Sequence, residues 1–191
     1  MDKSVYTRLL FVDTETGGLD SRKHSLLSVG LAVWDQDDGL IASNEFFLKN
    51  DEYATTKAAE RINKFDRNMH DEKAIDSKIL LSEIKRFALS NFSEGYPITL
   101  AGHNIQFDVS FLRALFADNG ASFDNFFSHR AVDTHSILRS LVFAGKIQQD
   151  ISSSAKAFHY FNIKANPRHS ALGDILATVE LFEKMLALID R

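Results

Sequence analysis

The chain has 191 residues, with 26 acidic and 22 basic side chains, a formal net charge of −4 and no cysteine. The absence of cysteine excludes disulfides, thiolate metal sites and a cysteine nucleophile, and the acidic balance argues against a DNA-binding module held mainly by phosphate contacts. It does not argue against an enzyme that holds a strand end through bound metal ions, whose charge the sequence does not count.

No apolar run approaches the roughly 20 residues that a membrane span needs, and residues 1–8 lack the apolar stretch of a signal peptide. We find no internal repeat and no proline-rich linker. We therefore expect a single cytoplasmic domain over residues 1–191, with no membrane partner.

The first third of the chain has the pattern of strands. Leu9–Val12 is a short apolar run, as expected of a central strand buried on both faces. Two longer runs, Leu26–Trp34 and Leu40–Leu48, flank the turn signal Asp37-Asp38-Gly39, so we expect them to pair as a hairpin. Apolar residues at helical spacing then predict a helix over Ile79–Leu89.

Strands and helices alternate in the second half. Ile98–Ala101 is predicted to be a strand, followed by a helix over Asp108–Asp118 that ends at Asn119-Gly120. Ala131–Asp133 is predicted to be a further strand, followed by a helix up to Gly145, and a long apolar stripe predicts a last helix over Leu172–Ile189. A three-strand meander followed by strand–helix alternation indicates an α/β fold with a mixed sheet and helices on its faces.

Two carboxylates stand at the end of the first strand, in Asp13-Thr14-Glu15. Side chains alternate along a strand, so Asp13 and Glu15 project from the same face. They would repel each other, and no lysine or arginine lies between Leu9 and Ser21, so a divalent cation between them is the economical partner. For an isolated D-x-E, a strand that simply runs out into a polar loop is the commoner explanation.

A second polar segment, His103 to Asp108, follows the carboxyl end of the strand Ile98–Ala101. Open α/β sheets usually build their sites at this end of the strands. Taken alone, Asp108 is explained slightly better as an N-cap or first-turn aspartate than as a metal ligand.

The third segment runs from His169 to Asp174. Helix positions five apart diverge by about 140°, so these two residues cannot share a helical face. We place His169, which follows Pro167, in the loop that enters the last helix, and Asp174 at the edge of its apolar stripe. The ordinary alternatives are a surface aspartate and a hydrogen-bonded loop histidine. Three such segments together nevertheless favour a hydrolytic site in which four carboxylates hold two metal ions and a histidine is the base.

The three segments resemble the motifs of the DnaQ-like (DEDDh) 3′→5′ exonuclease family, which has a ribonuclease H-like fold. D-x-E is matched by Asp13–Glu15 and continues as Thr16-Gly17-Gly18-Leu19-Asp20. H-N-x-x-F-D is matched by His103–Asp108, and H-x-x-x-x-D by His169–Asp174. The motifs follow the family order and span residues 13–174.

The resemblance implies hydrolysis of single-stranded nucleic acid from its 3′ end to nucleoside 5′-monophosphates. It implies that two Mg²⁺ or Mn²⁺ ions are held by Asp13, Glu15, Asp108 and Asp174, and that His169 deprotonates the attacking water. The backbone of Thr16, Gly17, Gly18 and Leu19 would cradle the terminal nucleotide. Near the scissile end, the resemblance places His103, Asn104 and Phe107.

The resemblance leaves the branch and the partners open. The sequence of the first motif, Asp-Thr-Glu-Thr-Gly-Gly-Leu, resembles that of the proofreading branch more than those of the RNase T and oligoribonuclease branches. We expect a stand-alone exonuclease or an isolated domain. A homodimer and a polymerase partner both stay open, as does the choice of DNA or RNA, because no residue identifies a contact to the 2′-hydroxyl. The alternatives are a catalytically silent nucleic-acid-binding or adaptor domain of the same fold, and an endonuclease of that fold.

Overall fold

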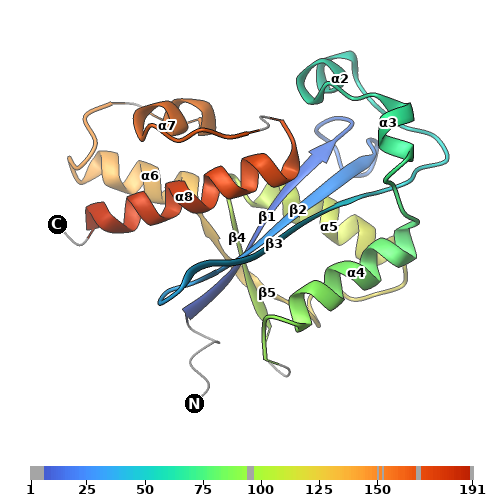
Figure 1. The fold of residues 1–191 in the computed structure, drawn as a ribbon, viewed down its shortest axis with the longest axis horizontal. Coiled ribbons are helices and arrows are strands. Elements are labelled where there is room, and N and C mark those ends of the chain that lie inside the picture. Colours follow the sequence, from blue (N-terminus) through green and yellow to red (C-terminus); the bar gives the residue numbers. More distant parts are fainter. Residues whose placement is uncertain (1–6, 94–96, 150, 152, 167–168, 190–191) are drawn as a thin grey trace.

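The computed structural model describes residues 7–93, 97–149, 151, 153–166 and 169–189. Within them the strands form one five-stranded sheet with the order β3-β2-β1-β4-β5 (Figure 1). The strands are β1 (Arg8–Thr16), β2 (Leu26–Asp35), β3 (Gly39–Phe47), β4 (Ile98–Gly102) and β5 (Phe127–Asp133). The first three strands pair antiparallel, and β4 and β5 continue the sheet in parallel to β1. The predicted meander, its hairpin and the mixed sheet are confirmed.

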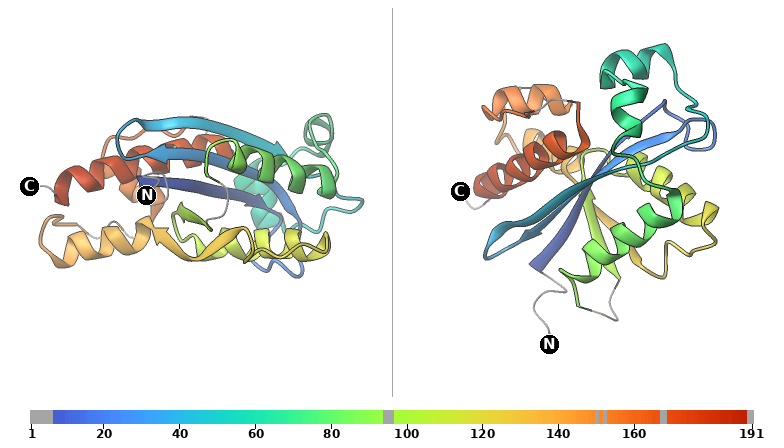
Figure 2. Two further views of the ribbon diagram at one scale, coloured as in Figure 1. Left: turned by 90° about the horizontal axis from the view of Figure 1, so that it is seen from below. Right: turned by 45° about the vertical axis from the view of Figure 1, so that its right-hand side comes forward.

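Four helices pack on the two faces of the sheet. They are α4 (Ser77–Leu89), α5 (Gln106–Asp118), α6 (Thr134–Phe143) and α8 (Ala171–Ile189). The right-hand view of Figure 2 shows α4 and α5 on one side of the sheet and α8 on the other. None of the helices in the described part of the chain has both the length and the apolar content to cross a bilayer.

Three short helices were not predicted: α2 (Lys57–Asn63), α3 (Arg67–Asp71) and α7 (Ser154–Tyr160). Each has seven residues or fewer, too few for an apolar stripe to repeat. In α2 no residue is buried, so its sequence carries no core-facing pattern. As Figure 1 shows, α2 and α3 lie beyond the ends of β1 and β2.

Several predicted boundaries are wrong by a few residues. β1 extends beyond the apolar run Leu9–Val12 to Thr16, because the polar residues Asp13 to Thr16 keep pairing with β2, as the predicted alternation of Asp13 and Glu15 requires. β5 begins at Phe127 instead of Ala131, and the exposed residues His129 and Arg130 hide its start. Smaller differences are that α5 begins at Gln106, β3 covers Gly39–Phe47, α6 ends at Phe143 and α8 begins at Ala171.

Side-chain alternation along β1 divides the core into two clusters. Leu10 and Val12 pack with residues of α4 and α5, whereas Phe11 packs with residues of α6, α7 and α8. It follows that Asp13 and Glu15 lie on the α8 face of the sheet and Thr14 on the α5 face.

Candidate active site

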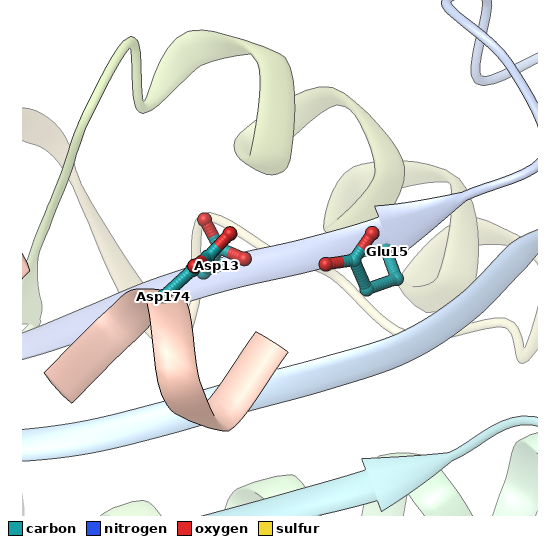
Figure 3. A group of neighbouring side chains, drawn as sticks. All are labelled: Asp13, Glu15 and Asp174. Atoms are coloured by element: carbon teal, nitrogen blue, oxygen red, sulfur yellow. The ribbon is translucent and has the colours of Figure 1, made fainter. Parts of the chain in front are cut away.

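Three carboxylates from two elements gather at the end of β1. Asp13 and Glu15 come from β1 and Asp174 from the first turn of α8, and one oxygen of each lies within 4.8 Å of the others. All three side chains are half-buried. In Figure 3 they face the space between the strand and the helix. The structure therefore brings together the first and third sequence segments.

A glycine in β2 lets α8 begin directly on the sheet. Gly30 pairs with Asp13, and a Cβ built on Gly30 would lie 2.5 Å from the carbonyl carbon of Ala171. Real Cβ atoms essentially never come that close, so any side chain there would push the start of α8 away from β1 and β2. Ser170 caps this helix, because its Oγ accepts a bond of 3.0 Å from the amide of Gly173.

Asp108 reaches β1 from the opposite face. It lies in the first turn of α5, and its Oδ1 accepts bonds from the backbone amide of Thr14 at 2.8 Å and from the Thr14 hydroxyl at 2.7 Å. The pairing of β1 with β4 ends at Phe11 with Ala101, so the carboxylate supplies the acceptor that a strand would otherwise offer to Thr14. Asp108 does not cap its helix, since the N-cap is Ile105.

Burial makes Asp108 electrostatically unusual. The residue is 4% exposed, and the loss of hydration raises the pKa of its carboxyl from 3.8 to about 7. The two bonds from Thr14 oppose this rise, and the negative charge of Asp133 adds to it. Asp108 is not part of the three-carboxylate group, so the sequence prediction that all four carboxylates bind metal remains a proposal for this residue.

His169 lies in the loop before α8, as predicted, and its backbone is left-handed, with φ of 63°. Histidine is one of the residues that adopt this conformation more readily than most. The half-buried side chain lines a cavity together with Glu15, so the histidine and the β1 carboxylate border the same space.

The residues of the second segment also have structural contacts. The Nδ1 of His103 lies 3.0 Å from the Thr134 hydroxyl, and the backbone N–H of Asn104 donates to Asp133 Oδ1 at 2.9 Å. The ring of Phe107 packs against Phe111 with centroids 5.2 Å apart. These contacts attach the segment to α5 and to the end of β5.

The loop after β1 is tightly packed and presents one apolar side chain. The amide of Gly17 donates to Ser25 O at 2.7 Å, and a Cβ on Gly17 would lie 2.2 Å from Ala54 O. The Thr16 hydroxyl donates to the carbonyl of Gly18 at 2.8 Å. Leu19 is 85% exposed, so it offers an apolar surface in the loop that follows Glu15 along the chain.

Sequence reasoning missed three residues that shape this region. Thr14 was treated only as the spacer of D-x-E, although its position predicts a side chain on the α5 face. Gly30, a glycine inside an apolar strand, signals a close approach by another part of the chain, but only the structure identifies the start of α8 as that neighbour. Asn63, whose Nδ2 donates to Thr16 O at 2.9 Å, belongs to the unpredicted helix α2.

This sheet, with its carboxylate cluster between β1 and α8, has the architecture of ribonuclease H-like nucleases. The family model RNase_T, described as Exonuclease, matches residues 10–182, and the chain belongs to this family. The predicted DnaQ-like family and its fold are confirmed.

Two curated relatives share about a quarter of their aligned residues with the chain. It is 24% identical over 187 residues to the DNA polymerase III PolC-type of Caldanaerobacter subterraneus subsp. tengcongensis, a match that covers 97% of the chain and 12% of the polymerase. It is 25% identical over 139 residues to the oligoribonuclease of Corynebacterium glutamicum, covering 68% of the chain and 60% of that protein.

The fold is similar to that of solved nucleases. Exonuclease I of E. coli in complex with a dT13 oligonucleotide superposes with a TM-score of 0.80 at 17% identity, over 96% of this chain and 43% of that one. Cell-death related nuclease 4 (CRN-4) superposes with a TM-score of 0.78 at 13% identity, over 96% and 64%. The chain thus spans less than two thirds of each of these four proteins.

Proposed function

We propose that the chain is a metal-dependent 3′→5′ exonuclease that releases nucleoside 5′-monophosphates from single-stranded nucleic acid. The observation that carries the proposal is the convergence of Asp13, Glu15 and Asp174 within 4.8 Å, from two elements of an exonuclease-family fold. An adaptor domain without activity would not need to keep these three carboxylates together.

The donor set fits Mg²⁺ or Mn²⁺. Both are hard cations that prefer oxygen ligands, and three carboxylate oxygens at this spacing can share one ion. Asp108 is a further proposed ligand through Oδ2, because Thr14 bonds to Oδ1. Two such ions, when bound, would stabilise the charge that develops on the phosphate and on the leaving 3′ oxygen.

His169 is the proposed general base. It precedes α8, which begins at Ala171, and it borders the same cavity as Glu15. There it would take the proton from the attacking water while that water adds to the terminal phosphodiester. Since the ring is not part of the three-carboxylate group, its proposed role is proton transfer and not metal binding.

The 3′-terminal nucleotide would lie against the loop after β1. The backbone of Thr16, Gly17 and Gly18 would border its sugar, and the exposed Leu19 would cover its base. His103, Asn104 and Phe107 would lie on the other side of the terminal nucleotide, next to α5. The complex of the structurally similar Exonuclease I with dT13 supports a single-stranded substrate, and both DNA and RNA are proposed.

The test is hydrolysis of single strands labelled at the 3′ or the 5′ end, with Mn²⁺, with Mg²⁺ and with EDTA. We expect 5′-labelled strands to shorten one nucleotide at a time and 3′-labelled strands to release labelled mononucleotide at once. Asp13→Asn is the inactive control, and Asp118→Asn, an exposed position at the end of α5, is the matched active control. Internal fragments as first products would indicate an endonuclease, and tight binding without cleavage would indicate an adaptor domain.

A further inference from the structure

A second feature adjoins the carboxylates on the side of the sheet away from β4. A cavity of about 190 Å³ begins at Glu15 and His169 and extends across β2 and β3 to Met69 and His70 of α3. The strand register places Ser28 opposite Glu15 and Phe47 opposite Ser28, so the cavity follows one row of residues across the sheet. None of Thr16 to Leu19, His103, Asn104 and Phe107 lines it. The residues proposed to hold the terminal nucleotide and the residues that line this cavity are therefore different sets.

The size and walls of the cavity suit one planar ring. Its volume is below the roughly 300–1,000 Å³ of clefts that hold drug-sized ligands. Phe47 and Phe65 form aromatic walls, and both pack against the buried His70, with ring centroids 5.5 and 5.2 Å apart. His70 is itself held by a contact of 2.9 Å between its Nε2 and Leu48 O. The aromatic walls are thus fixed before any ligand arrives, as stacking on a base requires.

Two charged side chains of the lining, Lys73 and Glu45, can bind opposite kinds of group: the lysine an anion and the glutamate a hydrogen-bond donor. The Nζ of Lys73 lies 5.5 Å from the centroid of the Phe47 ring, at an exposed position where it can meet a phosphate. Glu45 is held in place by a bond of 3.1 Å from the Ser28 hydroxyl to its Oε1. Its Oε2 can accept a second bond, and an ionised carboxylate accepts only.

We propose that this cavity receives the base on the 5′ side of the scissile phosphodiester, and that Glu45 makes it prefer bases with an exocyclic amine. Adenine, cytosine and guanine carry an exocyclic amine that can donate to the carboxylate. Thymine and uracil have no such amine, and their one N–H donor, at N3, lies between two carbonyl oxygens that a carboxylate repels. The proposal rests on the proposed function, since it takes the scissile phosphate to lie at Asp13, Glu15 and Asp174.

The test compares oligonucleotides that differ only in the penultimate base, dC or dT, with the same terminal nucleotide. We measure their binding in Ca²⁺ and their hydrolysis in Mn²⁺. Wild type should prefer dC by roughly 10- to 150-fold, the worth of one hydrogen bond to a charged group. Glu45→Gln should remove the preference, because an amide can bond either base. Glu72→Gln, an exposed glutamate beside Lys73 that does not line the cavity, should keep it.

Photocrosslinking of wild type provides an independent measurement should Glu45→Gln fold poorly. A 5-iodo-dC at the penultimate position should crosslink to peptides containing Phe47 or Phe65, and the same base four nucleotides upstream should not. Equal affinity for dC and dT in wild type, or crosslinks only outside these peptides, would overturn the proposal while 3′-end hydrolysis left the exonuclease assignment standing. Failure to bind or cleave any oligonucleotide would overturn both.

Discussion

Asp108 leads to an unusual prediction, that removing its charge stabilises the metal-free protein. Burial raises the pKa of this carboxyl from 3.8 to about 7 in the folded chain. Between about pH 4 and pH 7 the folded state therefore binds a proton that the unfolded state has released, so the free energy of unfolding falls as the pH rises through this window. Above about pH 7 Asp108 is ionised in both the folded and the unfolded state, and the full loss of stability caused by burying its charge is present. An aspartate in a salt bridge has the opposite pH dependence, because it makes the free energy of unfolding rise with pH.

The magnitude follows from the same two pKa values. A rise from 3.8 to about 7 corresponds to about 4 kcal/mol of lost stability at pH 8. In Asp108→Asn this cost is absent, while the amide oxygen can still accept the two bonds from Thr14. The stability of the variant minus that of wild type should thus grow by up to about 4 kcal/mol between pH 4 and pH 8.

The assay is urea unfolding of wild type and Asp108→Asn in EDTA at intervals from pH 4.5 to 8. Asp118→Asn, on the exposed end of the same helix, is the control and should follow wild type at every pH. A constant difference between wild type and Asp108→Asn over this range would refute the reasoning, because it would mean that Asp108 ionises as readily in the folded as in the unfolded chain. With Mn²⁺ at pH 8 we expect wild type to gain more stability than the variant, by mass action.

Four further predictions concern the metal, the base, the position of α8 and a partly buried ion pair. Activity should vanish in EDTA and return with Mg²⁺ or Mn²⁺, with Ca²⁺ binding but not supporting turnover; cleavage in chelator would contradict this. His169→Ala should lower turnover by roughly 10²- to 10⁴-fold with Mn²⁺ affinity nearly unchanged, and retention of more than about a tenth of the turnover would exclude the base assignment. Gly30→Ala should cost about 1–3 kcal/mol of stability and most of the activity, because α8 must shift; wild-type melting and turnover would show that the contact with Ala171 is tolerant. The bond from Arg8 lowers the pKa of Asp35, so Asp35→Asn should be less stable above about pH 4, and the deficit should disappear as the pH falls through the lowered pKa; a pH-independent deficit in urea unfolding would contradict the pairing.

The sequence alone predicts the strand order of the meander, because the first two strands are rich in apolar residues and the turn at Gly39, which joins the second strand to the third, has a clear signal. It also predicts one site of four carboxylates, Asp13, Glu15, Asp108 and Asp174, and the structure brings three of them, Asp13, Glu15 and Asp174, within 4.8 Å of one another. The shared face of Asp13 and Glu15 follows from alternation along β1, which is a local property. The separate attachment of Asp108 could not be predicted, because the bond to Thr14 joins residues 94 positions apart.

The same limit applies to Gly30 and Glu45. A glycine inside a buried strand indicates that something approaches closely, but only the packed structure identifies α8 as that neighbour. Glu45 lies in an edge strand, where an exposed polar residue is expected, and its position beside the carboxylates depends on the register between β2 and β3.

The bond between Asp108 and Thr14 bears on how related sequences are interpreted. A descendant of this fold that no longer cleaves nucleic acid could replace Asp13, Glu15 or Asp174 with little effect on folding, because these side chains are half-buried and lie at the end of β1. At position 108 it would still need a side chain that accepts two hydrogen bonds in a buried place. An Asp or Asn there, with the other three positions changed, would therefore mark an inactive homologue and not an active one with a rearranged site.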